Sequence, residues 1–155
     1  MSLNLDEKVV IKNMCEWELY FQRIESAGEV MLPRKGTNRL TRAELQAQVF
    51  ANNVMFTGTD GKGSHARIYI DDQPTRVMLG FETEDGSEKQ ELLTPDKVAE
   101  ILAIKQINKF KETVEKSVVI QSEKLVLIEE AKKQGLNDHA KIKFLEEYTG
   151  YKFTE

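Results

Sequence analysis

The chain has 155 residues, of which 40% are hydrophobic and 31% are charged, and its formal net charge is −4. This length suits one ordinary domain, or a small domain with a helical appendage, and excludes any need for disulfides or metal to complete the core. The acidic balance argues against a general nucleic-acid-binding protein, which normally carries a basic excess.

The chain also lacks the features of secreted and membrane proteins. Cys15 is the sole cysteine, so no intramolecular disulfide can form, and we expect its thiol to be buried. No segment resembles a signal peptide, and no apolar run approaches the ~18 residues that suggest a membrane span. We therefore expect an intracellular protein without membrane association.

The first half of the chain is predicted to be rich in β-structure. Short runs of β-branched and aromatic residues, bounded by turn residues such as Pro33 and Gly36, are typical of strands. One helix is expected over residues 42–51, because Thr41 and Glu44 have the spacing of a capping box, in which each side chain accepts a hydrogen bond from the other residue's N–H. The predicted strands cover residues 8–12, 16–21, 29–32, 54–57, 66–71 and 76–81.

The second half has helical periodicity. Thr94 is a typical N-cap and Pro95 a typical first helical residue, so a long helix is predicted from this point. Ser122 and Asn137 are expected to cap two further helices, and Gly135 to follow the end of the first of these. The three predicted helices cover about residues 95–116, 123–134 and 138–149.

The sequence therefore predicts the α+β class. Residues 1–85 should form a small β-rich sheet or barrel with one short helix, and residues 86–155 should form a three-helix segment. The boundary is placed at the acidic, turn-rich run 82–87, where the composition changes.

One loop resembles a phosphate-binding motif. Residues 58–64, Gly-Thr-Asp-Gly-Lys-Gly-Ser, are similar to the Gly-Thr-Asn-Gly-Lys-Gly-Ser loop of the folylpolyglutamate synthase and Mur ligase families. The resemblance implies a nucleotide site in which Lys62 reaches the terminal phosphates and the Ser64 hydroxyl binds magnesium. Such a loop must open a helix, whose N-terminal amides complete the site. Residues 65–71 have strand composition instead, so we predict a β-hairpin over 57–66 with an Asp-Gly turn.

The residue types that bind metals or activate nucleophiles are scarce. Cys15, His65 and His139 stand far apart and form no metal-ligand pair. Ser64 and His65 are neighbours in sequence, but catalytic triads are assembled from distant segments, so adjacency does not make a dyad. We therefore expect no catalytic residue, no metal and no cofactor.

Two sets of residues are candidates for binding. The loop supplies the first, because a long polar, glycine-rich loop on a compact β-unit is a common place for recognition. A basic cluster around the predicted helix start supplies the alternative, since positive side chains and free helix N–H groups could hold a phosphate or a partner's carboxylates. The loop set is Thr59, Asp60, Lys62, Ser64 and His65, and the basic cluster is Arg34, Lys35, Arg39 and Arg42.

The overall layout carries a second resemblance. The run from Phe56 to Asp72, followed by an acidic linker and a terminal helical segment, resembles uncharacterised proteins encoded in bacteriophage and prophage clusters of Gram-positive bacteria. The resemblance implies a non-enzymatic accessory or virion-associated role in the cytoplasm of a bacterial host cell. We therefore expect a binding or assembly module, with a protein partner or self-association as a homo-oligomer. The alternatives are a nucleic-acid-binding accessory protein that uses the basic cluster and, less favoured, a nucleotide-binding enzyme that uses Lys62.

Overall fold

The chain divides into two compact units. The computed structural model describes residues 3–90 and 92–153 and has the predicted α+β class. The units are Met1–Glu91 and Leu92–Glu155, so the division falls beyond the predicted boundary at residue 85. Among the described residues, no helix combines the length with the apolar character that a membrane span requires.

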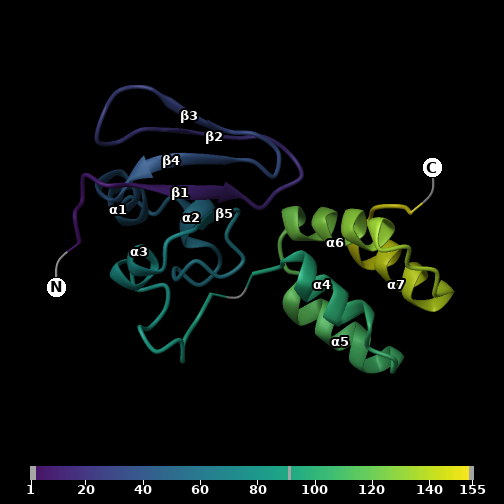
Figure 1. Cartoon of the computed structure of the whole chain (residues 1–155). Coiled ribbons are helices and arrows are strands. Elements are labelled where there is room, and N and C mark those ends of the chain that lie inside the picture. Colours follow the sequence, from purple (N-terminus) through teal and green to yellow (C-terminus); the bar gives the residue numbers. More distant parts are fainter. Residues whose placement is uncertain (1–2, 91, 154–155) are drawn as a thin grey trace. The chain divides into compact units, whose positions relative to one another are not determined.

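Unit 1 contains two antiparallel sheets and is not a closed barrel (Figure 1). One sheet has the strand order β4–β1–β5, and a two-stranded ribbon pairs β2 with β3. The sequence did not predict β4, because Leu40 is the only apolar residue among its five. β2 and β5 are shorter than the predicted strands 16–21 and 66–71. The strands are β1 (Lys8–Asn13), β2 (Leu19–Gln22), β3 (Glu29–Leu32), β4 (Thr37–Thr41) and β5 (Ile68–Ile70).

The strand predictions at 54–57 and 76–81 are wrong, because helices occupy these segments. The Asn53 side chain accepts a hydrogen bond from the N–H two residues on, at 3.1 Å, and the Asp72 side chain accepts one from the N–H three residues on, at 3.2 Å. Each side chain caps a helix start, and this local bonding outweighs the β-branched composition that follows. The helices are α2 (Val54–Thr57) and α3 (Gln73–Met78).

The predicted helix of unit 1 is confirmed as α1 (Arg42–Phe50), but only half of its capping box forms. Thr41 Oγ1 accepts the Glu44 N–H at 3.1 Å, as predicted. The Glu44 carboxylate instead accepts the N–H of Ile24 at 3.0 and 3.1 Å and that of Glu25 at 3.0 Å. Glu44 therefore fixes the distant β2–β3 turn against α1, which the sequence spacing could not show.

An apolar core joins the sheet, the ribbon, α1 and α2. Phe21 of β2 and Phe56 of α2 meet edge to face, with ring centroids 5.2 Å apart and an interplanar angle of 82°. Cys15 is fully buried in this core, which confirms the prediction. The largest of the other fully buried core side chains are those of Ile11, Leu32, Leu40, Leu45, Ile68 and Ile70.

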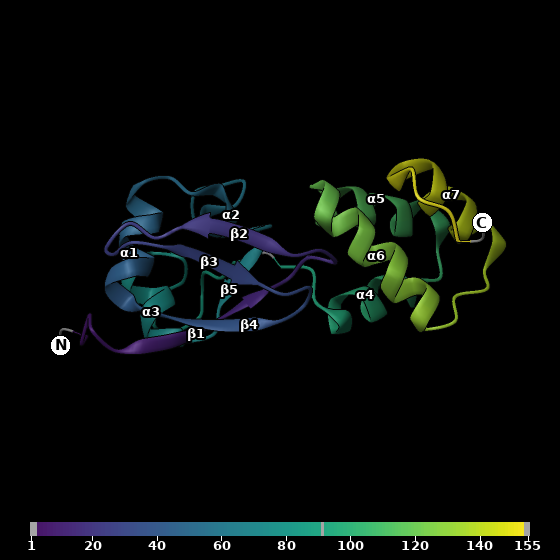
Figure 2. The same ribbon diagram turned by 90° about the horizontal axis from the view of Figure 1, so that it is seen from above.

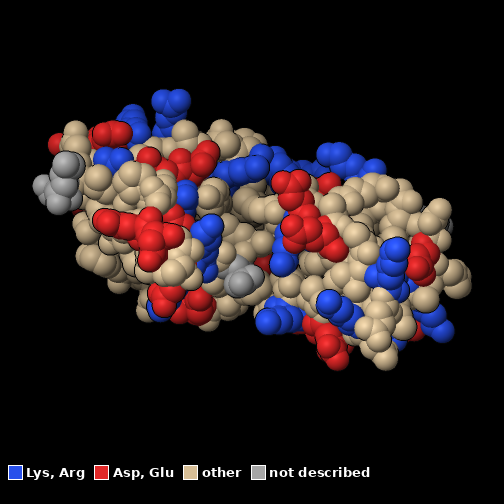
Figure 3. Space-filling model, turned by 60° about the horizontal axis from the view of Figure 1, so that its bottom comes forward, with Lys and Arg blue, Asp and Glu red and all other residues tan. Residues whose placement is uncertain are grey.

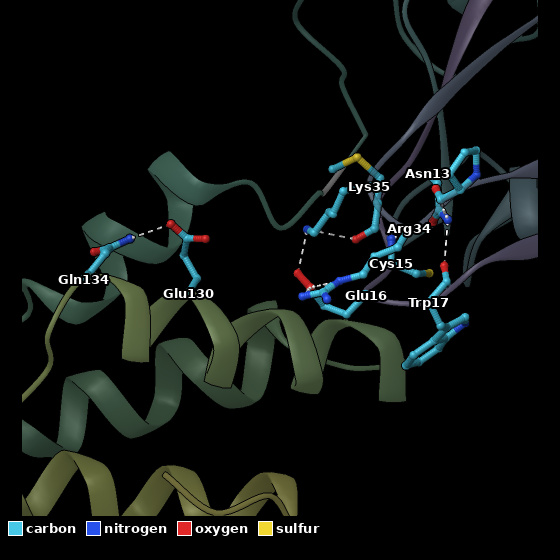
Figure 4. Close-up of polar contacts among 10 residues, drawn as sticks. Asn13, Cys15, Glu16, Trp17, Arg34, Lys35, Glu130 and Gln134 are labelled. Atoms are coloured by element: carbon cyan, nitrogen blue, oxygen red, sulfur yellow. Dashed lines mark hydrogen bonds and ion pairs between the residues drawn. The ribbon is translucent and has the colours of Figure 1, made fainter. Parts of the chain in front are cut away.

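The buried side-chain amide of Asn13 ties two turns of unit 1 to the sheet (Figure 4). Its Nδ2 donates to the backbone oxygens of Trp17 at 2.7 Å, Pro33 at 3.0 Å and Leu32 at 3.3 Å. Its Oδ1 accepts the Cys15 N–H at 2.7 Å. Because Asn13 is the last residue of β1 and faces the core, these bonds anchor both the β1–β2 loop and the β3–β4 turn.

Unit 2 contains four helices among its described residues where the sequence predicted three (Figure 2). The single helix predicted over 95–116 is wrong, because the chain leaves the helix after Leu102 and starts another at Ile107. The last carbonyls of a helix have no partner within the helix. At the end of α4, the Leu102 carbonyl accepts a hydrogen bond from Lys141 Nζ of α7 at 2.7 Å. The helices are α4 (Pro95–Leu102), α5 (Ile107–Ser117), α6 (Gln121–Lys133) and α7 (His139–Thr149).

The predicted start of the helical segment and one predicted end are confirmed. Thr94 Oγ1 accepts the Lys97 N–H at 3.1 Å, and Gly135 follows α6 with a φ of 73°. These helices enclose their own apolar core, to which all four contribute. Its fully buried side chains include Val98, Ile101, Phe110, Val114, Leu127, Ile128 and Leu145.

The other two predicted caps of unit 2 are wrong. Ser122 lies buried inside the first turn of α6, and Ile120 is the N-cap, with its N–H bonded to the Glu123 carboxylate at 3.2 Å. At α7 the cap is Asp138 rather than Asn137, because the carboxylate of Asp138 accepts the N–H three residues on, at 3.3 Å. Both errors are shifts of one or two residues along the chain. At α6 the Glu123 carboxylate, rather than a capping side chain at the N-cap, accepts the free N–H groups.

We predict that Asn13→Leu lowers the free energy of unfolding of unit 1 by about 3 kcal/mol, because buried backbone carbonyls lose their donor. Trp17 is the only tryptophan, so its fluorescence during urea unfolding reports unit 1. Asn38→Leu is the matched control: the Asn38 Nδ2 bond to Met31 O is exposed, at 3.1 Å, and its loss should cost under about 1 kcal/mol. Equal effects of the two variants would contradict the role given to Asn13.

We predict that Lys141→Met destabilises unit 2 by about 2 kcal/mol, because the Leu102 carbonyl loses a charged donor while the apolar stem is kept. Helix loss during urea unfolding, followed by far-ultraviolet circular dichroism, measures the effect. Lys143→Met, at an exposed lysine on the same helix, should change the free energy by no more than about 0.5 kcal/mol. A null effect of Lys141→Met would show that the bond does not hold the end of α4.

Candidate functional site

The glycine-rich loop after α2 is closed on itself. The Thr59 N–H donates to the Ser64 oxygen at 2.9 Å, and the Gly63 N–H donates to the Thr57 oxygen at 2.7 Å. The predicted β-hairpin is therefore wrong, because a helix rather than a strand enters the loop. Gly58 has a φ of 68°, and a Cβ there would lie 2.0 Å from the Ser64 oxygen, so only glycine fits.

The loop amides bind a carboxylate of the chain itself. Asp60 Oδ1 accepts the N–H of Lys62 at 2.7 Å and that of Ser64 at 3.2 Å. Partial burial raises the pKa of Asp60, but these hydrogen bonds outweigh it and hold the pKa below its usual value. Amides that a phosphate would need are thus occupied, and the next regular element is β5 rather than the helix that a phosphate loop opens.

The five residues of the predicted loop set differ in their exposure to solvent. Thr59, Asp60 and Lys62 are exposed at the tip. The Ser64 side chain is buried, and His65 is half-buried with a φ of 58°, a conformation that non-glycine residues adopt rarely. The part of the predicted set that another molecule can reach is therefore the tip, residues 59–62.

A polar cleft lies between this loop and residues 86–90. Gln90 Nε2 donates to the Gly63 oxygen at 3.0 Å and joins the two segments across 27 positions of sequence. The cleft has a volume of about 610 Å³ and is lined by Asp60 and Lys62 on the loop side. The sequence analysis did not predict that residues 86–90 form the other side of this cleft. Nothing in an acidic, turn-rich run shows which distant loop it contacts.

The acidic run is ordered by a turn within unit 1. Asp85 Oδ1 accepts the Ser87 N–H at 2.9 Å and the Thr83 hydroxyl at 2.7 Å. These bonds, led by the one from the Ser87 amide, lower the pKa of Asp85 to about 2. The Thr83 N–H donates to the Glu88 oxygen at 3.1 Å and closes the turn. The run predicted as a linker is therefore a hydrogen-bonded wall of the cleft.

The predicted basic cluster does not form a joint surface. Arg34 and Lys35 both pair with Glu16: Arg34 Nε lies 2.8 Å from Oε2, and Lys35 Nζ lies 3.5 Å from Oε1 (Figure 4). Arg39 is exposed on β4, whereas Arg42 is buried. The four residues therefore differ in exposure and in partners, and the anion site predicted from them stays a prediction that their ion pairs and burial do not favour.

The buried Arg42 is a structural residue. Its Nε donates to Thr75 Oγ1 at 3.0 Å, its Nη2 to Asp72 Oδ2 at 3.1 Å and its Nη1 to the Asn4 oxygen at 3.2 Å. Partial burial raises the pKa of Asp72, but hydrogen bonds from Thr75 and Arg42 lower it below its usual value. Arg42 thus links the start of α1 to the start of α3.

Two large apolar side chains stand exposed directly before the loop. Phe50, the last residue of α1, is 78% exposed, and Val54, the first residue of α2, is 59% exposed. The Gly58 N–H donates to the Val54 oxygen at 3.0 Å, so Val54 lies one helical turn from the start of the loop. Phe50 has the largest exposed fraction of the large apolar side chains that the structure describes, so it is a candidate anchor for a partner. The sequence analysis missed this pair because it assigned Val54 to a strand.

No protein-family model, curated protein or solved structure matches the chain, so the candidate site is judged on its geometry. Within residues 3–90 and 92–153, no group of three or more His, Cys, Asp or Glu side chains is placed to hold a metal ion. On the face of unit 2 drawn in Figure 3, basic and acidic side chains are interspersed, as on a solvated surface. The exposed apolar pair and the loop tip of unit 1 are therefore the strongest candidate.

We predict that Asp60→Asn destabilises unit 1 at neutral pH and that this difference disappears in acid. The folded-state pKa of Asp60 is lowered, so its stabilisation is complete above the usual carboxyl pKa and is lost as the pH falls through the lowered value. Urea unfolding followed by Trp17 fluorescence, at a series of pH values, measures the difference. Asp71→Asn, at an exposed carboxylate outside the loop, is the control, and a pH-independent difference for Asp60→Asn would contradict the assignment.

Proposed function

We propose that the protein is a binding and assembly module that self-associates through unit 1. The contact surface, here called the apolar–loop surface, consists of Phe50, Val54 and the loop tip 59–62. The observation that carries the proposal is the exposed apolar pair beside a loop that its own hydrogen bonds hold in one shape. A binding role accounts for both features, whereas stability alone favours neither an exposed phenylalanine nor a long polar loop.

The apolar–loop surface has the composition of a protein interface. Phe50 and Val54 can serve as apolar anchors, and the polar tip residues can form the rim around them. Burial of a large apolar side chain stabilises a complex by ~1.5–3 kcal/mol. Because the loop is already ordered, its docking loses less conformational entropy than the docking of a flexible loop would.

The charges of the loop tip favour a second copy of the chain as the partner. A two-fold interface brings the same surface of both copies together, so neighbouring opposite charges can pair across the axis. Asp60 and Lys62 are such neighbours, both exposed at the tip. A two-fold contact would place Lys62 of one copy near Asp60 of the other, around the apolar anchors.

The layout of the chain also supports a role in binding and assembly. Its resemblance to bacteriophage and prophage proteins of Gram-positive bacteria favours an accessory or virion-associated assembly protein over an enzyme. A loop whose amides are bound to Asp60 supports this choice over the nucleotide-binding alternative. The proposed location follows from that role and is the bacterial host cell or the assembled virion.

We predict that the full chain forms dimers in a concentration-dependent manner and that Phe50→Ser with Val54→Ser shifts it to monomers. The loss of two exposed apolar anchors should weaken dimerisation by at least roughly tenfold. Sedimentation velocity over a series of protein concentrations measures the dimerisation constant. Lys62→Glu, which leaves the anchors in place, should weaken the dimer by a smaller factor.

Tyr20→Ser with Met31→Ser is the matched control for the anchor variant. These side chains pair across β2 and β3 and are 48% and 41% exposed, so this variant also removes two exposed apolar groups. It should dimerise as the wild type does. A wild-type chain that remains monomeric at high concentration, or equal loss in both double variants, would contradict the proposed surface.

A further inference from the structure

The β4–β1–β5 sheet has an outer face that the core does not use. Along β1, Val9 and Ile11 are buried, whereas Lys8 and Lys12 are exposed, so alternate residues point away from the core. The register places Arg39 of β4 opposite Val10 on this outer face. The strands lie side by side in Figure 1, and the outer face is separate from the apolar–loop surface in sequence and in element.

The β5 edge adds an arginine and a tyrosine to the same face. Tyr69 lies opposite Lys12 in the register of β1 and β5, between the buried Ile68 and Ile70. Arg67 has the same alternation, since it is half-buried between the buried Ala66 and Ile68. Its backbone oxygen accepts the Met14 N–H at 2.8 Å, which continues the ladder by one residue.

The charge of the outer face is opposite in sign to that of the chain. Four basic residues, Lys8, Lys12, Arg39 and Arg67, lie on it, and none of them forms an ion pair with a carboxylate among the described residues. One exposed carboxylate, that of Asp71, follows the same alternation next to Val10, so the basic residues outnumber the acidic one on this face. The chain as a whole has a net charge of −4. Unpaired cations gathered on a flat face of an acidic protein indicate a polyanionic partner.

The spacing of these cations suits a chain of regularly spaced anions. Residues two apart on a strand are separated by roughly 7 Å, and neighbouring strands by roughly 4.8 Å. Lys8 and Lys12 therefore lie roughly 13 Å apart along β1, with Arg39 between them on the adjacent strand. An extended single strand of nucleic acid can place successive phosphates along such a path.

The ring of Tyr69 is held in place at the edge of this face. The Arg76 guanidinium lies 5.0 Å from the ring centroid, and its Nη1 donates to the Ile70 oxygen at 2.8 Å. A cleft of about 370 Å³ adjoins the ring and is lined by acidic residues, among them Glu82, and by the basic Arg76 and Lys89. A nucleobase can stack on an aromatic ring and donate a ring N–H or amino hydrogen to a carboxylate, whereas an acidic peptide has no base to stack there.

From these contacts we infer that the outer face of the β4–β1–β5 sheet binds single-stranded nucleic acid. Lys8, Lys12, Arg39 and Arg67 contact the phosphates, and Tyr69 stacks on a base beside the adjoining cleft. The surface shares only Arg39 with the basic cluster predicted from sequence. This binding goes beyond the proposed self-association and uses different residues, so each can fail while the other holds.

The test measures binding of the full chain to a fluorescein-labelled oligothymidylate of about 20 nucleotides by fluorescence anisotropy, at about 50 mM salt and upward. The affinity should fall with rising salt, with a logarithmic slope of roughly −3 for about four phosphate contacts. Lys12→Glu with Arg39→Glu should weaken binding by at least roughly tenfold. Lys105→Glu with Lys133→Glu changes the net charge equally at exposed lysines of unit 2 and should bind as the wild type does.

Two further binding measurements distinguish nucleic acid from other polyanions. Tyr69→Leu keeps an apolar side chain but removes the aromatic ring, and it should weaken oligothymidylate binding roughly fivefold without changing the salt slope. A labelled poly-aspartate peptide of equal charge should bind more weakly than the oligonucleotide. Absence of oligonucleotide binding by the wild type, equal loss in both charge-reversal variants, no effect of Tyr69→Leu, or tighter binding of poly-aspartate would each overturn the inference. Unchanged circular dichroism spectra confirm that the variants are folded.

Discussion

The order of unit 1 depends on the bonds made by the buried amide of Asn13. This buried side chain donates to backbone oxygens of the β1–β2 loop and the β3–β4 turn, and it accepts an N–H of the β1–β2 loop. A buried polar group is costly when unpaired, so a slip of β1 by one residue would lose these bonds and bury Lys8 and Lys12. One interaction therefore selects which side chains of β1 fill the core and which face outward.

The sequence predicted the α+β class and most elements whose signals are local. The Thr94 cap and the strand 29–32 follow from residues within one turn or one strand. The strand predictions at 54–57 and 76–81 failed because Asn53 and Asp72 cap helices there, and short apolar runs fit either structure. The end of α4 at Leu102 could not be predicted, because the side chain that bonds the Leu102 carbonyl belongs to Lys141, 39 residues away.

The sequence indicated the loop of the candidate site, but it indicated neither the exposed apolar pair beside it nor what the loop amides bind. A glycine-rich stretch with Lys62 and Ser64 correctly indicated an unusual loop, yet the amides of that loop hold Asp60. Whether such amides bind a phosphate or a carboxylate of the same chain depends on backbone directions that a motif does not encode. The same limit applies to the basic cluster, since sequence proximity did not show that Arg42 would be buried while Arg39 would stay exposed.

The carboxylate of Asp60 also has a kinetic consequence for the loop. Because the chain supplies its own anion, the loop needs no ligand or ion to reach its ordered form. A molecule that docks on the tip meets a surface already in its bound shape, so rigid-body encounter rather than loop rearrangement would limit the association rate. Differences in affinity among variants of the tip should then arise mainly from how fast complexes dissociate.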